Sequence, residues 1–281
     1  TLNSPAPMVT WAAGEIYTLN GDLDALALFR KNFAGAEPNE PTWANPEFFG
    51  YLALAKSIST PKPLRDSLSK SIAASSSNFM EQSKESGFGQ ALSTADYYWG
   101  SNAHVLGKAM VMIADYEINK NKQARATALS QLDYLLGRNA LGISMVTGYG
   151  SLRTMQPYHW IYKAYDAIMP GWVSGGPNSY PSGADDALST LINAGTPAAK
   201  CWLDTISSYA SNEGSTDENA LLLFVAGYFA ADTFAMHPAS KAFNLKEAVN
   251  NRRSREPRRE KMDESNCFTD KFDILPQRNV R

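Results

Sequence analysis

Apolar residues recur at the spacing of an α-helix along most of the chain. In segment 8–22, "MVTWAAGEIYTLNGD", they lie three and four positions apart, at Val9, Ala12, Ala13, Ile16 and Leu19. The Asn20-Gly21 pair that follows is a typical helix stop. The pattern therefore predicts a helix that ends at this pair.

The same spacing continues in pairs of segments that are separated by short polar links. These segments are 22–33, 45–57, 63–82, 102–118 and 121–136. Short links favour antiparallel packing of successive helices, so the pairs are predicted to be helical hairpins. No stretch with the alternating pattern of a strand competes with them. We therefore predict an all-α protein.

Residues 142–184 differ from the helical repeat because they are rich in glycine, proline, tyrosine and tryptophan. A loop of this length in a compact domain is usually functional or disordered. The high aromatic content argues against disorder. We expect an ordered surface that binds a flat ligand, with core packing as the alternative role for its aromatic rings.

The C-terminal part, residues 239–281, loses the apolar period and contains eleven lysines and arginines together with seven acidic residues. The interleaved acids favour a solvated or disordered tail over a nucleic-acid-binding arm. An ending that is not native to the helical domain would have the same character. We predict two parts: a helical portion over residues 1–238 and a basic, polar tail over residues 239–281.

Composition excludes several classes of function. The chain has 281 residues, 44% hydrophobic and 19% charged, with a formal net charge of −2. This balance gives no reason to expect a nucleic acid or a membrane as partner. The longest apolar run, 220–231, is too short to cross a bilayer. The three histidines lack the spacing of a transition-metal site, so no metal is predicted, and the two isolated cysteines define no disulfide framework.

Four acidic residues lie in segment 202–230, "WLDTISSYASNEGSTDENALLLFVAGYFA". Ser215 and Glu218 have the spacing of a capping box, and Asp217 would complement the dipole of the helix that follows. Helix formation thus explains two of the four acids. Asp204 and Glu213 are not explained in this way.

The residues around these acids resemble the acid-containing signature of glycoside hydrolase family 9, the inverting cellulases. The resemblance rests on Trp202-x-Asp204, Tyr209, Glu213-x-Ser215 and Asn219-Ala220, and on "YASNEGSTDENA" beside the family's "Y..NE.A...NA". Further landmarks are similar and occur in the family's order: "WAAGEIYTLNGD", "WGSNAHVLGKAM", "QLDYLLGRNALGISMVTGYG" and "PGWVSGGPN". The similarity covers about residues 8–234.

The resemblance implies an (α/α)6 barrel with an active-site cleft across the loops at one end. It implies that Glu213 is the general acid that protonates the leaving glycosidic oxygen, with Asp204 as a supporting acid. It also implies that the aromatic loop lines the sugar cleft. The candidate substrate-binding residues are Tyr149, Tyr158, Trp160, Trp172 and Tyr209.

Two departures from the family pattern affect the expected site. After "GYG" the family carries a His-His-Arg triplet, whereas this chain reads Tyr158-His159-Trp160. His159 remains a candidate site residue, and the sugar contacts must differ. The catalytic base of the family lies in a "DAGD" motif, which does not occur here, and "GADD" at 183–186 is not a substitute. The chain therefore resembles the C-terminal portion of a family 9 catalytic domain, incomplete at its N-terminus.

The resemblance leaves several functions open. The leading prediction is an endoglucanase-type enzyme that cleaves β-1,4-glucosidic bonds of cellulose or cellodextrins, without a cofactor. The alternatives are a non-catalytic carbohydrate-binding remnant, an exo-acting β-glucosidase or glucosaminidase on the same fold, and a helical scaffold without sugar affinity. Family relatives suggest secretion, and structural calcium at Asp166, Asp185 or Asp186 is a weak alternative because no EF-hand spacing supports it.

Overall fold

The computed structural model describes residues 5–165 and 168–236. Residues up to Asp232 form one compact unit, and the helix that closes this unit continues to Met236. The predicted domain boundary at residue 238 and the predicted tail over 239–281 lie outside the described residues. Asp166 lies outside them as well.

The described part of the chain is helical, with only three isolated β-bridges besides the helices. This confirms the prediction of an all-α protein. The long helices are α1 (Ala6–Asn20), α2 (Leu23–Phe33), α3 (Glu47–Lys56), α4 (Lys62–Glu85), α5 (Ser101–Asn119), α6 (Lys122–Leu135) and α10 (Thr216–Met236). The shorter elements are η1 (Thr94–Asp96), α7 (Trp160–Tyr165), α8 (Asp186–Asn193), η2 (Ala198–Lys200) and α9 (Tyr209–Asn212).

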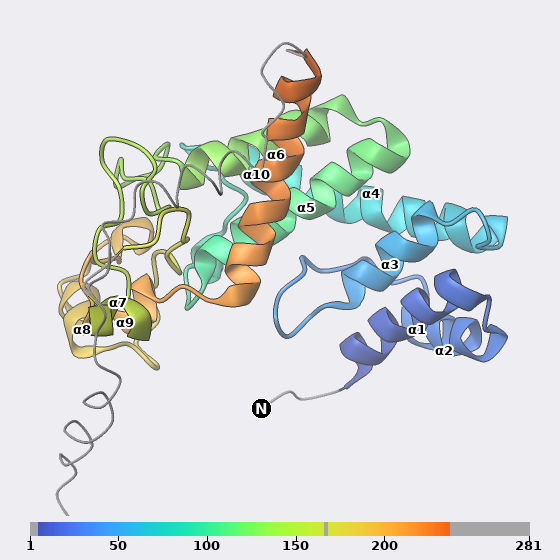
Figure 1. Ribbon diagram of the computed structural model, residues 1–281, viewed down its shortest axis with the longest axis horizontal. Coiled ribbons are helices and arrows are strands. Elements are labelled where there is room, and N and C mark those ends of the chain that lie inside the picture. The colour runs from blue at the N-terminus through green and yellow to red at the C-terminus, as the bar shows by residue number, and fades with distance from the viewer. Residues whose placement is uncertain (1–4, 166–167, 237–281) are drawn as a thin grey trace, which may run out of the picture. The chain divides into compact units, whose positions relative to one another are not determined.

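The first six helices form the predicted hairpins. Helix α1 packs on α2, α3 packs on α4, and α5 packs on α6. Contacts of α1 with α3 and of α4 with α5 join each hairpin to the next (Figure 1). Local signals set the ends of these helices. Gly21 ends α1 with φ of 76°, while Asp22 and Asn121 accept hydrogen bonds from the first free N–H groups of α2 and α6.

Helix α5 lies at the centre of this arrangement, because every residue from Ser101 to Asp115 is buried. A helix that is buried on all sides must be covered by other elements all round. The buried core includes Val105, Leu106 and Met112 of α5 together with Leu221 and Val225 of α10. The two helices that carry the "WGSN" and "NA" motifs at their N-termini therefore share one core.

Helix α1 buries a different face from the one that its apolar period suggested. Thr10, Ala13, Gly14 and Tyr17 are buried, whereas Ile16 is exposed and Leu19 is 86% exposed. The side chains toward α3 are small because the two backbones approach closely at Gly14. Tyr17 of α1 packs in the described core, whereas Ile16 and Leu19 point away from it.

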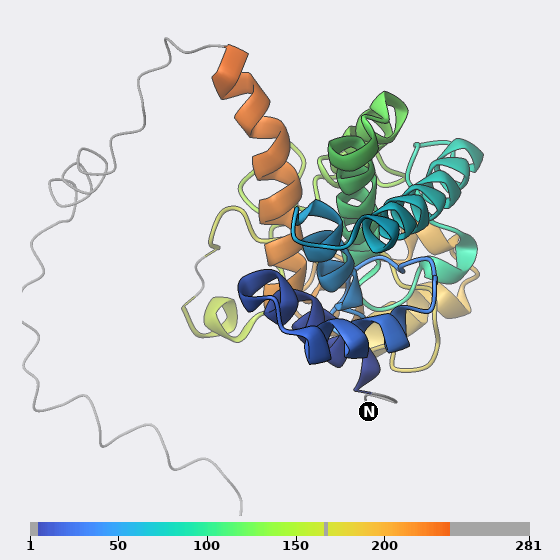
Figure 2. The same ribbon diagram turned by 90° about the vertical axis from the view of Figure 1, so that its right-hand side faces the viewer.

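An apolar groove of about 520 Å³ lies between α1 and α10, the first and last long helices. Its lining is almost wholly apolar: Met8, Trp11, Pro41, Thr42, Trp43, Pro46, Phe49, Met110, Asp217, Ala220, Leu221 and Phe224. Figure 2 shows α1 in blue and α10 in orange, which form its two sides. The groove reaches the buried core at Met110 and Leu221, so its floor is continuous with the interior.

The described residues of segment 142–184 are ordered by backbone hydrogen bonds, as predicted. Residues 166 and 167 are not described. Thr147 N donates to Trp172 O at 2.9 Å, and Asn102 N at the start of α5 donates to Gly175 O at 2.9 Å. In Figure 1 this segment gathers at the end of α5 and α10 where both helices begin. That end carries the candidate site.

Candidate active site

Glu213 follows the single turn of α9 and precedes α10. Its N–H donates to Tyr209 O at 3.1 Å, which ends the turn, and its backbone is extended with φ of −70° and ψ of 138°. Gly175 packs against this backbone so closely that a Cβ there would lie 2.7 Å from Glu213 O. Glu213 is therefore fixed from both sides at the base of the aromatic segment.

The residue before Glu213 anchors this loop in the core. The buried Asn212 side chain donates to Gln156 O at 2.7 Å and accepts from Ser174 Oγ at 2.8 Å. Tyr158 N donates to Asn212 O at 3.0 Å. A buried amide that satisfies both its donor and its acceptor holds its neighbours in one arrangement.

Other residues of the signature also position the loop. The Trp202 indole donates to Ser174 Oγ at 2.9 Å. Asn219 Oδ1 accepts from Val173 N at 3.1 Å, and its amide donates to Ser215 O at 2.7 Å. The signature thus encodes the hydrogen bonds that join the aromatic segment to the start of α10.

The second signature acid, Asp204, holds the backbone of the aromatic loop. Its carboxylate accepts from Met155 N at 3.0 and 2.8 Å and from Gln156 N at 2.7 Å. A carboxylate is well suited to bind adjacent N–H groups because it has only acceptors. Asp204 therefore holds residues 155 and 156 of the aromatic loop, and its role as a supporting acid stays a prediction.

Aromatic rings form a row beside Glu213. Trp160 lies 6.3 Å from Tyr158, Tyr158 lies 5.8 Å from Tyr209, and Tyr209 lies 5.5 Å from Trp99, measured between ring centroids. Trp99, Trp160 and Tyr209 are exposed on this row. The structure thus brings together three predicted substrate-binding residues and adds Trp99.

The other two predicted substrate-binding residues differ in their surroundings. Trp172 packs against the edge of His159 at 4.8 Å between ring centroids, and a Cβ at Gly214 would overlap its indole. Trp172 therefore lies against the loop that carries Glu213. Tyr149 is 60% exposed, and its N–H donates to Val146 O at 3.4 Å.

His159 lies close enough to Glu213 for its charge to affect the carboxyl. Its Nδ1 accepts from Ile161 N at 3.2 Å, so the proton of the neutral ring is on Nε2. The ring also contacts Tyr162 at 5.8 Å between centroids. The structure therefore places His159 with the candidate acid rather than away from it.

Burial raises the pKa of the Glu213 carboxyl. The Trp99 hydrogen bond and the charge of His159 oppose this effect without cancelling it. A carboxyl that keeps its proton at higher pH is suited to act as a general acid. Chemically, the arrangement places a protonatable oxygen next to a surface of rings on which the faces of sugar residues can stack.

Comparison with known proteins decides the family. The profile of Glycosyl hydrolase family 9 matches residues 7–226. The chain belongs to this family. That match includes α1 to α9, most of α10 and every candidate residue named above.

Relatives in family 9 include enzymes of several bacteria. Endoglucanase C of Cellulomonas fimi is 29% identical over 239 residues, which cover 78% of this chain and 21% of the relative. Cellodextrinase of Butyrivibrio fibrisolvens is 37% identical over 157 residues, covering 55% of this chain and 28% of the relative. The chain thus spans less than a third of either protein.

A solved structure of a family 9 enzyme, endoglucanase J30, superposes with a TM-score of 0.75 at 28% identity. The superposition covers 79% of this chain and 41% of that chain. A metagenome-derived family 9 endoglucanase superposes with a TM-score of 0.73 at 29% identity, again over 41% of its length. These neighbours confirm the α/α barrel type of fold.

The expected helix-start signals near Glu213 are confirmed. Ser215 N donates to Glu218 Oε2 at 3.1 Å, and Glu218 N donates to Ser215 Oγ at 3.3 Å, which is a capping box at the start of α10. Asp217 lies in the first turn, as predicted. Glu213 combines a raised pKa with a place beside the row of aromatic rings, whereas the carboxyl of Glu218 is engaged in the capping box.

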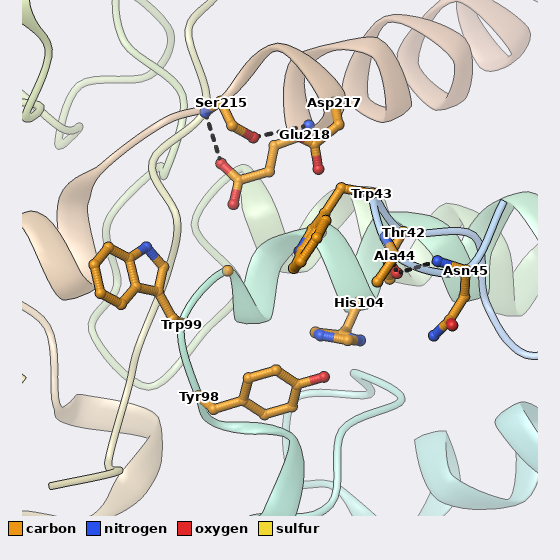
Figure 3. A pocket seen from close by; sticks show the side chains of 12 residues that line it. Thr42, Trp43, Ala44, Asn45, Tyr98, Trp99, His104, Ser215, Asp217 and Glu218 are labelled. Atoms are coloured by element: carbon orange, nitrogen blue, oxygen red, sulfur yellow. Dashed lines mark hydrogen bonds between the residues drawn. The ribbon is translucent and has the colours of Figure 1, made fainter. Parts of the chain in front are cut away.

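A cavity of about 280 Å³ adjoins this site, and several of its lining residues were not predicted as site residues. It is lined by Thr42–Asn45, Tyr98–Gly100, Ala103, His104, Ser215, Asp217 and Glu218 (Figure 3). Trp99 belongs both to this cavity and to the aromatic row. The "WGSN" motif marked its position in the sequence, but only tertiary packing shows that Trp99 contacts Glu213.

One wall of the cavity is a histidine held by a carboxylate. His104 Nδ1 lies 2.6 Å from Glu40 Oε1, and both side chains are mostly buried. Burial raises the pKa of the Glu40 carboxyl, but the His104 hydrogen bond and the Lys108 charge outweigh it, so the net pKa is lowered. Glu40 and His104 are 64 residues apart, so no local pattern could pair them.

No cluster of three or more histidines, cysteines, aspartates or glutamates that could hold a metal ion occurs among residues 5–165 and 168–236. The Asp185 carboxylate accepts from Leu188 N at 2.7 Å and Ala210 N at 2.9 Å. It therefore caps α8 and ties this helix to α9. Over the same residues, no helix is long and apolar enough to cross a membrane.

Proposed function

We propose that this chain is the C-terminal portion of a family 9 catalytic domain that hydrolyses β-1,4-glucosidic bonds of cellulose or cellodextrins with inversion. Glu213 is the general acid in this proposal. The observation that carries it is the Glu213 carboxyl, whose pKa is raised by burial and which lies beside a row of exposed aromatic rings. The names of its relatives, an endoglucanase and a cellodextrinase, support the substrate class.

The aromatic row gives the substrate its orientation. The CH faces of glucose residues stack on tyrosine and tryptophan rings, and the row from Trp160 to Trp99 would carry successive residues of a linear chain. Trp99 is the ring next to the acid, because its side chain is close enough to lower the pKa of the Glu213 carboxyl. Stacking there would place a glycosidic oxygen within reach of that carboxyl.

In the proposed reaction, protonated Glu213 gives its proton to the leaving glycosidic oxygen as the bond to the anomeric carbon breaks. A water molecule attacks the anomeric carbon from the opposite face and loses a proton to a base. In inverting enzymes the two carboxyls are roughly 6.5–9.5 Å apart, which leaves room for that water. Trp99, Tyr209 and Asp204 act by positioning the substrate and the loop.

This mechanism needs a base, and the chain contains no "DAGD" motif that would supply it. We propose that the base carboxylate belongs to helices that pack in the apolar groove between α1 and α10, since this groove opens next to Trp43 and Asp217 of the cavity. In solved relatives the matching region is 41% of the chain. Turnover would then require both this chain and the helices that carry the base.

The experiment measures cellohexaose binding and reducing-end release by this chain beside Glu213→Gln and Trp99→Ala. We expect binding by the chain and by Glu213→Gln, because glutamine preserves the shape of the site. In Trp99→Ala we expect at least a tenfold loss of binding, because the substitution removes the ring on which a glucose residue would stack. Release by the chain, abolished in Glu213→Gln, would additionally identify a base within these residues.

Maltohexaose, which has α-1,4 bonds, is the matched ligand control and should not bind. Equal binding of both sugars, or cellohexaose binding that does not change in Trp99→Ala, would contradict the proposed site. If turnover is observed, its alkaline limit should lie above that of an ordinary carboxylic acid, because the raised pKa keeps Glu213 protonated at higher pH.

A non-catalytic carbohydrate-binding protein is the second candidate, and the missing "DAGD" motif favours it. Cellohexaose binding without release of reducing ends would support this second candidate. The result should be the same whether or not a segment that carries the base carboxylate is added. The exo-acting β-glucosidase or glucosaminidase remains a variant of the leading proposal. Its products would be single sugar residues, whereas an endoglucanase releases a range of oligosaccharides. We also propose that the full-length protein is secreted, because cellulose is outside the cell.

A further inference from the structure

Glu218 is a buried carboxylic acid that the proposed reaction does not use. It is 6% exposed, although it lines the cavity that adjoins the site. A buried carboxyl needs hydrogen bonds or neutrality to offset its loss of hydration. The surroundings of its two carboxyl oxygens indicate what this side chain does beyond starting α10.

One oxygen of Glu218 is bound to the loop that carries the candidate acid. Oε2 accepts from Ser215 N at 3.1 Å, two residues after Glu213. Ser215 Oγ accepts from Glu218 N at 3.3 Å. The carboxyl is therefore fixed relative to the backbone that places Glu213.

The other oxygen faces the segment that carries the hydrogen-bond partner of Glu213. A Cβ at Gly100 would lie 3.0 Å from Glu218 Oε1, and Gly100 has φ of 81°. Gly100 directly follows Trp99, whose side chain is close enough to lower the pKa of the Glu213 carboxyl. Figure 3 shows the Glu218 carboxyl directed toward Trp99 from the start of α10.

The charged groups around Glu218 favour its neutral form. Burial raises its pKa to about 8, and the charges of Asp217 and Glu213 add to this effect, while the hydrogen bonds from Ser215 oppose it. Across the cavity, His104 is held by the Glu40 carboxylate at 2.6 Å. The neutral acid can still accept from Ser215 N through Oε2.

We propose that Glu218 is a positioning residue for the Glu213–Trp99 pair: in its neutral form its carboxyl packs the Trp99–Gly100 turn against the Glu213 loop, and its ionisation loosens this contact. This inference rests on the proposed role of Glu213, but the contact itself does not depend on any substrate. Ionisation would add a third negative charge to those of Asp217 and Glu213, in a buried volume, which favours separation of the two segments.

The test follows the indole N–H signal of Trp99 by NMR in protein labelled with ¹⁵N-tryptophan, without ligand. The Trp99 signal is identified as the one that disappears in Trp99→Phe. In the unmodified chain it should shift with pH in two steps, one for Glu213 and one with a midpoint near 8 for Glu218. In Glu218→Gln the step near 8 should be absent, because the amide imitates the neutral acid.

Asp22→Ala is the matched control, because Asp22 also caps a helix: it accepts from Asp24 N and Ala25 N at the start of α2. Asp22 is not a residue of the candidate active site. This variant should keep the step near 8, although it also loses a helix cap. Persistence of that step in Glu218→Gln, or its absence from the unmodified chain, would overturn the inference. A step that Asp22→Ala also removes would show a general effect of helix capping instead.

Glu213→Gln provides a second variant should Glu218→Gln fail to fold. It should lose the step at lower pH and keep the step near 8, and loss of the latter would assign it to Glu213 and overturn the inference. Cellohexaose binding is measured separately. A retained step near 8 without cellohexaose binding would contradict the proposed function alone, whereas binding without this step would contradict the inference alone.

Discussion

Asp204, Glu213 and Glu218 lie within fifteen residues of one another, yet their surroundings give them different chemistry. Asp204 accepts hydrogen bonds from adjacent backbone N–H groups. Glu213 lies beside exposed rings with a raised pKa. Glu218 is buried and bonded to Ser215. At the scale of the residue, burial and the hydrogen-bond donors around a carboxyl together decide what it can do.

Replacing Asp204 with asparagine should loosen the aromatic loop. Asparagine has one acceptor oxygen and directs an N–H₂ group at N–H donors, so the bonds to Met155 and Gln156 cannot all form. We expect a loss of roughly 1–2 kcal/mol in stability and faster hydrogen exchange at these two amides. Asp186→Asn, at an exposed acid of α8, should leave both measurements unchanged. Equal exchange rates in the two variants would contradict the role of Asp204.

Glu218→Gln should stabilise the protein at neutral pH. The folded-state pKa is about 8, above the ordinary value of 4.5, so between these values the folded state holds a proton that the unfolded state has released. Stability contributed by the neutral acid is present at low pH and is lost as pH rises. Glutamine removes this dependence. Unfolding by urea should show that the free energy of unfolding rises in Glu218→Gln by roughly 2–3 kcal/mol near pH 7, and that this gain shrinks toward pH 5. A gain that does not depend on pH would contradict the raised pKa of Glu218.

At the scale of the element, helix ends and helix contacts are set by different residues. Asp22 and Gly21 fix where α2 begins and α1 ends. The contact between α1 and α3 depends on glycine instead. A Cβ at Gly14 would lie 2.8 Å from the Gly50 Cα, and a Cβ at Gly50 would lie 2.7 Å from Thr10 O. Backbone on both sides leaves no flexible group to move aside.

Gly14→Ala should therefore separate α1 from α3 and cost about 1–3 kcal/mol, as is usual for overpacking. Gly227→Ala is the matched substitution, because Gly227 lies within α10 with nothing near its Cβ position. Alanine there should add about 0.5–1 kcal/mol through its helix propensity. Thermal unfolding of both variants measures the contrast, and a neutral Gly14→Ala would contradict the close packing.

At the scale of the whole described unit, several large apolar side chains are exposed. Leu19 and Leu23 are 86% and 73% exposed, and the apolar groove between α1 and α10 lies in the same unit. Solved family 9 structures match this chain over 41% of their length. Helices of the remaining part are the occupant that we propose for this groove.

Leu19→Ser combined with Leu23→Ser should reduce self-association and the binding of the dye ANS, while unfolding stability stays within about 0.5 kcal/mol. The reason is that these side chains contribute little to the described core. Leu26→Ser, at a residue that is 4% exposed, should instead destabilise the protein strongly. Sedimentation and ANS fluorescence are the measurements. Unchanged self-association in the double variant would show that a different surface mediates it.

The sequence by itself determined the local features of this protein. The apolar period gave the helices, Asn20-Gly21 gave the end of α1, and Ser215 with Glu218 gave the start of α10, because each depends on residues within one or two turns. The family signature likewise identified Glu213 as the candidate acid and the aromatic loop around Tyr158 as its neighbour.

Only the tertiary structure decided which distant residues meet and which faces are buried. Trp99 reaches Glu213, and Glu40 reaches His104, because the hairpins bring their loops to one end of the helices. The apolar period of α1 could not show that Ile16 and Leu19 face outward. The apolar period reports how apolar side chains are spaced along a helix, whereas the burial of these side chains depends on which other helices pack against it.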